Sequence, residues 1–200
     1  MTYEERSHRT APPLASWWFA AGVSGFAWPP VWQDWAARAI ASSPAPAPWI
    51  IEMGKAKSIY DLRSALGLQV ALENVDPLTI GDTLLGYIWM RYEREELQLF
   101  DCLCYAVSMA EDHPSSIGCE AIYPLLNNLR WDNHDRIVSE GKRLFHRFKV
   151  KAIKQWANIN SSYQPHSAAR KSGLWGIFLA VMNVNSLPHS NTAKQAMYML

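Results

Sequence analysis

The strongest constraint on the fold is one long amphipathic helix, which the sequence predicts from residue 133 to about residue 157. Lysine, arginine and histidine side chains fill most of its faces, and Asp132 is expected to cap its N-terminus. Apolar side chains recur at steps of three and four along the remaining face: Ile137, Gly141, Leu144, Phe145, Phe148, Ala152 and Trp156. The pattern predicts a helix that buries one apolar stripe and exposes a strongly basic outer side.

The segment WPPVWQDWAARAI, residues 28–40, predicts another helix that rests on the core. Proline suits the first helical turn, where its missing N–H would be unpaired in any case. Trp28, Trp32 and Trp35 then fall at i, i+4 and i+7 on one face. Six of the ten tryptophans occur in the first 49 residues, so this layer is expected to supply much of the packing. We interpret the tryptophans as core rather than as a recognition surface.

Start and stop signals divide the rest of the chain into shorter helices. Ser58 and Asp61 resemble a capping box, and the helix that they open is expected to stop at Gly67. Asp76 followed by Pro77 repeats the start signal. The predicted segments are residues 13–22 (closed by Gly22), 58–66, 77–96, 97–112 and 117–129 (with a possible kink at Pro124). Of these, 97–112 is apolar on most faces and is expected to be the central buried helix. Residues 49–53 could form a strand or a helical turn.

The predicted fold class is all-α, an irregular array of about seven or eight helices around a single core. No internal repeat and no convincing alternating strand pattern occurs in the sequence. At 200 residues, with 49% apolar residues, the chain can bury a core without metal or disulfide support. Residues 1–160 are expected to form a single all-α domain. Residues 161–200 are expected to form a basic and apolar helical appendage packed on the same core.

The three cysteines and the ends of the chain favour a soluble cytoplasmic protein. Cys102, Cys104 and Cys119 are odd in number and form no CxxC pair, which argues against a disulfide framework. We interpret Cys102 and Cys104 as small buried hydrophobes. The charged start lacks the apolar region of a secretory signal. The longest apolar run, residues 174–184, is too short to cross a bilayer as a helix.

Two clusters of acids and histidines could carry metal-dependent hydrolase or nuclease chemistry, which is the alternative function. They lie in EDHP (111–114) and RWDNHDR (130–136), with these candidates: Asp112, His113, Asp132, His134 and Asp135. His134 and Asp135 are neighbours, however, and so point about 100° apart on a helix. A helix end and a helix start explain both clusters as well. Because no GxSxG, HExxH, P-loop or GxGxxG motif occurs either, we predict no catalytic residue, metal ligand or cofactor.

Charge is distributed unevenly, which suggests interaction surfaces. Residues 1–140 hold all eighteen acids and ten of the nineteen lysines and arginines, whereas residues 141–200 hold the other nine and no acid. We predict a partner-binding surface at the acids of this group: Glu93, Glu95, Glu96, Asp101 and Asp112. Arg91 is expected to pair with Glu95 at i,i+4. The basic helix, 142–156, could instead contact nucleic acid, but its aromatic residues lie on the apolar stripe rather than among the cations.

Residues 17–53 combine an aromatic opening, a glycine, WPPVWQDWAARAI, a proline-rich gap and PWIIEM. This order resembles the N-terminal portion of small uncharacterised bacterial proteins of the polymorphic-toxin immunity type. The resemblance implies a non-enzymatic protein that binds a cognate toxin and occludes its active site. It transfers no catalytic residue. In such a protein, acids would oppose the cations with which a nuclease toxin holds its substrate.

Overall fold

The computed structural model describes residues 12–129 and 134–162. Helices begin in it at the start signals that the sequence shows, such as Ser58 and Asp76. The described residues contain eight α-helices, a short 3₁₀ helix and no strand, which confirms the all-α class. The elements are α1 (Leu14–Val23), α2 (Pro29–Ala41), α3 (Pro48–Lys55), α4 (Ile59–Glu73), α5 (Pro77–Glu93), α6 (Leu99–Asp112), η1 (Cys119–Ala121), α7 (Tyr123–Asn128) and α8 (His134–Ser161). Asp132 and nearly all of the predicted appendage lie outside the described residues.

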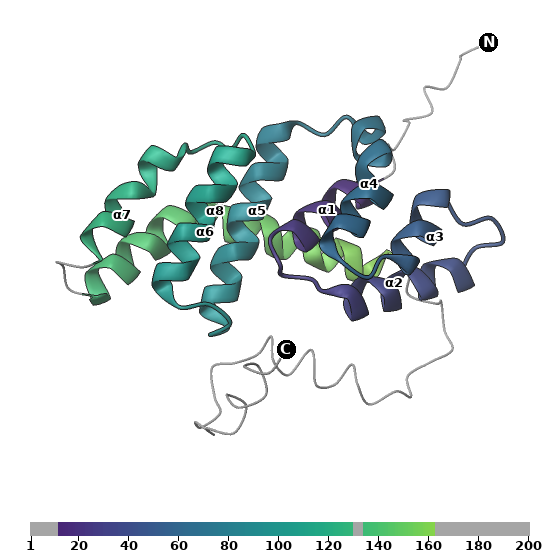
Figure 1. The fold of residues 1–200 in the computed structure, drawn as a ribbon, viewed down its shortest axis with the longest axis horizontal. Coiled ribbons are helices and arrows are strands. Elements are labelled where there is room, and N and C mark those ends of the chain that lie inside the picture. The colour runs from purple at the N-terminus through teal and green to yellow at the C-terminus, as the bar shows by residue number, and fades with distance from the viewer. Residues whose placement is uncertain (1–11, 130–133, 163–200) are drawn as a thin grey trace, which may run out of the picture. The chain divides into compact units, whose positions relative to one another are not determined.

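The long helix predicted from the basic segment is α8, and its apolar stripe is confirmed. Ile137, Phe145 and Trp156 are buried along it, and Leu144 is half-buried. Figure 1 shows α8 running along the helix array from α7 at one end to α1 and α2 at the other. The helix therefore contacts elements that are far apart in the sequence.

The central buried helix is α5, so the prediction that residues 97–112 take this place was wrong. Every residue of α5 from Gly81 to Met90 is buried, whereas α6 exposes Phe100 and Asp101 on its outer face. A Cβ atom at Gly86 would overlap the backbone carbonyl of Phe148, so α5 and α8 approach each other backbone to backbone. The sequence pattern of α5 hides this burial, because polar residues such as Asp82 interrupt its apolar stretches.

The core has two parts, which meet at α5 and α8. The first part joins α1 to α4 and contains Trp18, Trp32, Trp35 and Trp156. The second joins α6, α7 and the first half of α8. The side chains of α5 divide between the two parts, since Leu84, Tyr87 and Met90 belong to the first and Leu85, Ile88 and Trp89 belong to the second.

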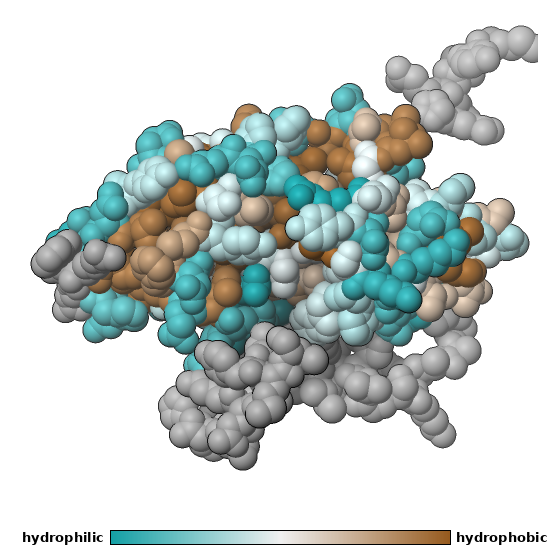
Figure 2. All heavy atoms as spheres, viewed as in Figure 1, coloured by the Kyte–Doolittle hydropathy of each residue, from teal (hydrophilic) through white to brown (hydrophobic). Residues whose placement is uncertain are grey.

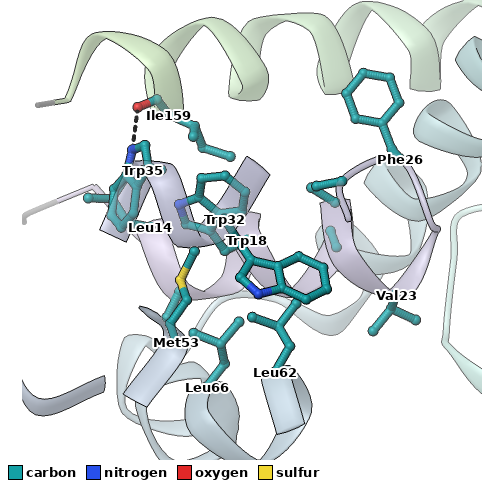
Figure 3. Close-up of a cluster of buried hydrophobic side chains, with 14 of the residues drawn as sticks. Leu14, Trp18, Val23, Phe26, Trp32, Trp35, Met53, Leu62, Leu66 and Ile159 are labelled. Carbon is teal, nitrogen blue, oxygen red and sulfur yellow. Dashed lines mark hydrogen bonds between the residues drawn. The ribbon is translucent and has the colours of Figure 1, made fainter. Parts of the chain in front are cut away.

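Two tryptophans of the predicted stripe lie in the first part of the core (Figure 3). The indole N–H of Trp35 donates to the carbonyl of Ile159 at 3.0 Å, and the indole N–H of Trp32 donates to the carbonyl of Ala56 at 3.0 Å. Trp28, in contrast, is 46% exposed. It has an extended backbone just before α2, so helical spacing does not govern its direction. The core interpretation is confirmed for Trp32 and Trp35 and wrong for Trp28.

Helix ends differ from the expected ones where glycine was taken as a stop. The capping box of Ser58 and Asp61 is present, but α4 continues past Gly67 to Glu73 and ends at Asn74, whose φ is 48°. In the same way α1 passes through Gly22 and ends one residue later. A glycine stops a helix only where the backbone turns left-handed, and here Asn74 takes that conformation.

The structure shows which conformation is adopted by two segments for which the sequence left alternatives open. Residues 49–53 form part of α3, which begins at Pro48. Pro124 lies in the first turn of the short helix α7, after the separate 3₁₀ turn η1, so it starts a helix rather than kinking one. Within the described ranges, none of the helices is both long enough and apolar enough to span a membrane.

Candidate partner-binding site

Four of the five predicted partner-binding acids lie where α5 ends and α6 begins, and we call residues 91–101 the α5–α6 corner. Helix α5 ends in two backbone hydrogen bonds, from Glu95 N–H to the carbonyl of Tyr92 at 2.9 Å and from Glu96 N–H to the carbonyl of Arg91 at 3.0 Å. This pair of bonds is the Schellman motif, in which the residue after the cap turns left-handed. Glu95 occupies that position with a φ of 59°.

Glu95 has the most unusual backbone conformation of the predicted acids. The left-handed conformation costs a residue with a Cβ atom roughly 1–2 kcal/mol, and glycine is the usual occupant of this position. The side chain of Glu95 is exposed and forms no hydrogen bond or ion pair with any residue that the structure describes. The fold therefore bears a cost at Glu95 that no internal contact of its carboxylate offsets.

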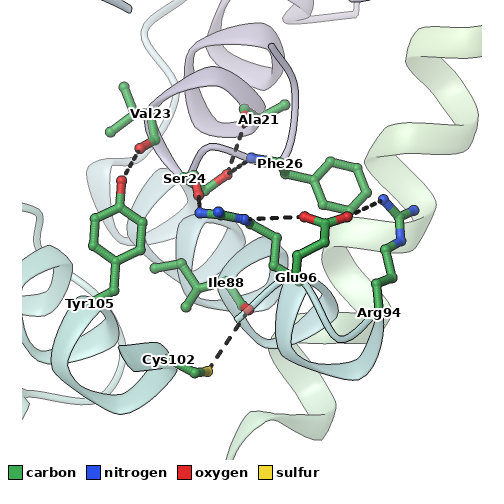
Figure 4. Close-up of polar contacts among 10 residues, drawn as sticks. Ala21, Val23, Ser24, Phe26, Ile88, Arg94, Glu96, Cys102 and Tyr105 are labelled. Atoms are coloured by element: carbon green, nitrogen blue, oxygen red, sulfur yellow. Dashed lines mark hydrogen bonds and ion pairs between the residues drawn. The ribbon is translucent and has the colours of Figure 1, made fainter. Parts of the chain in front are cut away.

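Glu96 has a structural role within the corner (Figure 4). Its carboxylate pairs with Arg91 at 3.3 Å and with Arg94 at 3.8 Å, so the expected Arg91–Glu95 pair was wrong. Arg91 also donates to the backbone carbonyl of Ser24 at 2.9 Å, and the guanidinium of Arg94 lies 4.2 Å from the centre of the Phe26 ring. These contacts fix the corner to the segment that follows α1.

Tyr105 adds a further contact between the corner and α1. Its hydroxyl group donates to the carbonyl of Val23 at 2.9 Å (Figure 4). The guanidinium of Arg91 lies 5.9 Å from the centre of the Tyr105 ring. Both α5 and α6 are therefore held to the end of α1, which makes the corner a fixed surface.

Glu93 is also engaged inside the fold. Its carboxylate pairs with Lys149 of α8 at 2.7 Å and accepts a hydrogen bond from the indole N–H of Trp89 at 3.2 Å. The pair with Lys149 holds the end of α5 against α8, whereas the hydrogen bond from Trp89 lies within α5. Only part of the negative charge of Glu93 is therefore available to a partner.

Asp101 lies in the first turn of α6, where the positive end of the helix dipole favours an acid. It is exposed and lines a shallow groove of about 420 Å³ together with Leu97, Tyr105 and Ser108. Asp112 is exposed at the other end of α6, about 16 Å away along the helix axis at 1.5 Å per residue. Asp101 and Glu95 thus lie at the same corner, six positions apart in the sequence, whereas Asp112 lies at the far end of α6.

The acid and histidine clusters do not form a metal site among the described residues, since no group of three or more His, Cys, Asp or Glu side chains there could hold an ion. Burial and the positive charge of Arg63 lower the pKa of His113, while Asp112 opposes them. The His113 ring packs edge-on against Phe19, with 5.9 Å between the ring centres. His134 and Asp135 are exposed in the first turn of α8.

Cys102 is a buried thiol, as predicted. It donates a weak hydrogen bond to the carbonyl of Ile88, with 3.9 Å from sulfur to oxygen. Burial raises its pKa to about 12, so the thiol is protonated at neutral pH and is not a nucleophile. Cys104 is half-buried at the groove beside Asp101.

The basic side of α8 is partly neutralised by α5, through the pair Lys149–Glu93 and a second pair, Lys151–Asp82, at 2.8 Å. A groove of about 490 Å³ lies between α7 and α8, with Arg143, His146 and Arg147 along one side and apolar residues such as Leu125 along the other. His146 is the aromatic side chain among the lining residues of this groove, which include no Phe, Tyr or Trp. The surface therefore offers cations for phosphate contacts but lacks the large aromatic rings on which successive bases stack.

Sequence reasoning missed Asp82, which is almost completely buried on α5. Its carboxylate accepts hydrogen bonds from Lys151 and from the backbone N–H of Ser116, both at 2.8 Å. It connects α5, α8 and the segment that follows α6. A lone acid between glycine and threonine in an otherwise apolar stretch was the available signal.

Comparison of the chain with protein-family models, with curated proteins and with solved structures gave no match.

Proposed function

We propose that the protein is a non-enzymatic immunity protein, which binds a cognate toxin and occludes the active site of that toxin. The contact surface in this proposal is the α5–α6 corner, with Glu95 and Asp101 at its centre. The observation that carries the proposal is the left-handed backbone of Glu95, an exposed acid at a position where glycine is the usual residue. A residue kept there at a cost to folding, whose charge forms no ion pair with the described part of the chain, fits a role outside the fold.

The rigidity of the corner supports the same proposal. Glu96, Arg91 and Tyr105 hold it to the end of α1, so the two outward acids keep their positions without a partner. A preorganised surface loses little conformational entropy on binding. Fixed carboxylates opposite the cations of a nuclease site would raise the rate of association and exclude partners of the wrong charge.

The test is binding of the full chain to the toxic domain encoded beside its gene, measured by isothermal titration calorimetry. We expect Glu95→Lys combined with Asp101→Lys to weaken binding by at least about 100-fold, because like charges would then face each other. Neither acid forms an ion pair with a residue that the structure describes, so the double variant should keep its circular dichroism spectrum. A chain with no affinity for that domain, or a double variant with unchanged affinity, would contradict the proposal.

The matched control is Glu120→Lys, which reverses an exposed acid of η1 outside the corner. It should bind the toxic domain as the unaltered chain does. A comparable loss in the control would mean that overall charge, rather than the corner, determines the affinity. Parallel titrations with RNA and DNA check the basic groove of α8, and nucleic-acid binding without toxin binding would favour that alternative.

A further inference from the structure

Helix α4 has apolar side chains on two opposite faces. Leu62 and Leu66 are buried against α1 and α3, whereas Tyr60 and Leu68 are each 76% exposed and Leu72 is 68% exposed. Figure 2 shows hydrophobic surface over this helix. A helix that is apolar on both sides is usually covered on both sides. We call the outer face, from Tyr60 to Leu72, the α4 stripe.

Gly67 is a second, independent observation on the same stripe. It lies in the interior of α4, where glycine destabilises a helix relative to alanine. A Cβ atom at this position would meet no atom of the described residues within 4 Å, so packing among the described helices does not explain the glycine. A missing side chain on an exposed apolar face permits close approach of another backbone. Gly67 therefore points to a partner helix packed on the stripe.

We propose that the α4 stripe is a self-complementary dimer interface, on which α4 of a second copy of this chain packs antiparallel. Tyr60, Ser64, Leu68 and Leu72 follow one another at four-residue steps along the stripe. With the two-fold axis at the middle of α4, near Leu66, each Leu68 faces Ser64 of the other copy. Each Tyr60 then faces Leu72 of the other copy. The large leucine thus meets a small residue, which is the complementarity that an isologous contact requires.

The charges at the two ends of α4 fit the antiparallel arrangement. Lys57 is exposed just before the helix and Asp76 is exposed just after it. Antiparallel packing brings Lys57 of each copy towards Asp76 of the other, so that opposite charges meet at both ends. Parallel packing would place lysine beside lysine and aspartate beside aspartate. Charge complementarity therefore selects the antiparallel dimer.

The small size of the stripe indicates a weak dimer. Fifteen residues make α4 about 22 Å long, and a helix is about 10 Å wide with its side chains. A contact of this size is smaller than the standard interface of about 800 Å² per partner. We therefore expect a reversible dimer with a dissociation constant in the micromolar range.

The first test is analytical ultracentrifugation of the full chain from about 1 µM to about 500 µM. The unaltered chain should dimerise, and Leu68→Glu should weaken dimerisation by at least about 100-fold, because each copy would bury an unpaired carboxylate in the apolar contact. Val150→Glu is the control, since Val150 is 52% exposed on α8. It should dimerise like the unaltered chain. All variants change exposed side chains, and circular dichroism checks that they fold.

The second test examines the antiparallel register. Tyr60→Lys and Leu72→Glu should each abolish the dimer alone, and an equimolar mixture should restore it, because the introduced lysine and glutamate then face each other. An unaltered chain that stays monomeric at about 500 µM would overturn the proposal and leave the stripe to a different protein. A Leu68→Glu variant that dimerises normally would overturn it as well. A mixture that stays monomeric would overturn the antiparallel register.

Discussion

Lys151 on α8 donates a hydrogen bond of 2.8 Å to Asp82 on the buried helix α5. The same carboxylate accepts from the backbone N–H of Ser116, so one acid connects three segments of the chain. Burial by itself would raise the pKa of Asp82, but the hydrogen bonds from Lys151 and Ser116 outweigh burial and hold this pKa below its ordinary value of 3.8.

Asp82→Asn should lower the free energy of unfolding by about 1–3 kcal/mol at pH 7, because hydrogen bonds to a charged group are lost. A carboxyl group with a lowered folded-state pKa stabilises the fold above its unfolded pKa, and this stabilisation is lost as the pH falls through the folded pKa. The deficit of the variant should therefore shrink below pH 3.8. Urea denaturation of the variant and of the unaltered chain, at pH 7 and again below pH 3.8, measures this deficit. Asp34→Asn, which alters an exposed pair, is the control, and an equal deficit at both pH values would contradict the prediction.

Trp32→Ala should lower the free energy of unfolding by about 3–5 kcal/mol, because it empties a site in the first part of the core. Trp32 is 2% exposed and also loses its hydrogen bond to Ala56. Trp28→Ala removes a half-exposed indole four positions earlier and should cost less than about 1 kcal/mol. Chemical denaturation compares the two variants. Similar losses of unfolding free energy for both variants would contradict the placement of Trp32 in the core and Trp28 at the surface.

Gly86→Ala and Gly67→Ala should change stability in opposite directions. The new Cβ atom at Gly86 would overlap the carbonyl of Phe148, so α5 and α8 would have to separate, at a cost of about 1–3 kcal/mol. At Gly67 the new Cβ atom meets no described residue within 4 Å, and alanine should stabilise α4 by about 0.5–1 kcal/mol. Thermal unfolding at low protein concentration, where dimers do not contribute, distinguishes the two. Destabilisation by Gly67→Ala would contradict the exposed position of this residue.

Cys102 should resist alkylation in the folded protein. Its pKa of about 12 leaves almost no thiolate at pH 8, and the side chain is completely buried. Iodoacetamide at pH 8 should therefore modify Cys102 only after the chain is unfolded in urea, whereas the half-buried Cys104 serves as the internal comparison. Peptide mass spectrometry locates the modified thiols. Rapid modification of Cys102 in the folded chain would mean that α5 and α6 separate readily.

The sequence was sufficient to predict features that depend on local chemistry. The capping box at Ser58, the proline start of α2 and the buried stripe of α8 follow from short-range hydrogen bonds and helical spacing. Features that depend on where a helix ends, or on residues far away in the sequence, were missed. Arg91 pairs with Glu96 rather than Glu95, because Glu95 leaves the helix in the left-handed conformation and the spacing of four no longer applies.

The central position of α5 was missed because it depends on α8, which is distant in the sequence. Gly86 lets α8 pack directly on its backbone, and a single helix pattern carries no information about which partner comes that close. The same limit applies to the candidate site. Its acids could be identified from the sequence, but the internal pairs that engage Glu93 and Glu96 depend on the tertiary fold.

Both parts of the core receive residues from α8, and this has a consequence for synthesis on the ribosome. Phe145 completes one part and Trp156 completes the other, yet α8 is the last described helix to be translated. Neither part can close until these residues have left the exit tunnel. At about 5–20 residues per second, the aromatic side chains of α1 and α2 wait for several seconds in a nascent chain without their final partners. The chain order therefore leaves these apolar side chains open to aggregation during that interval.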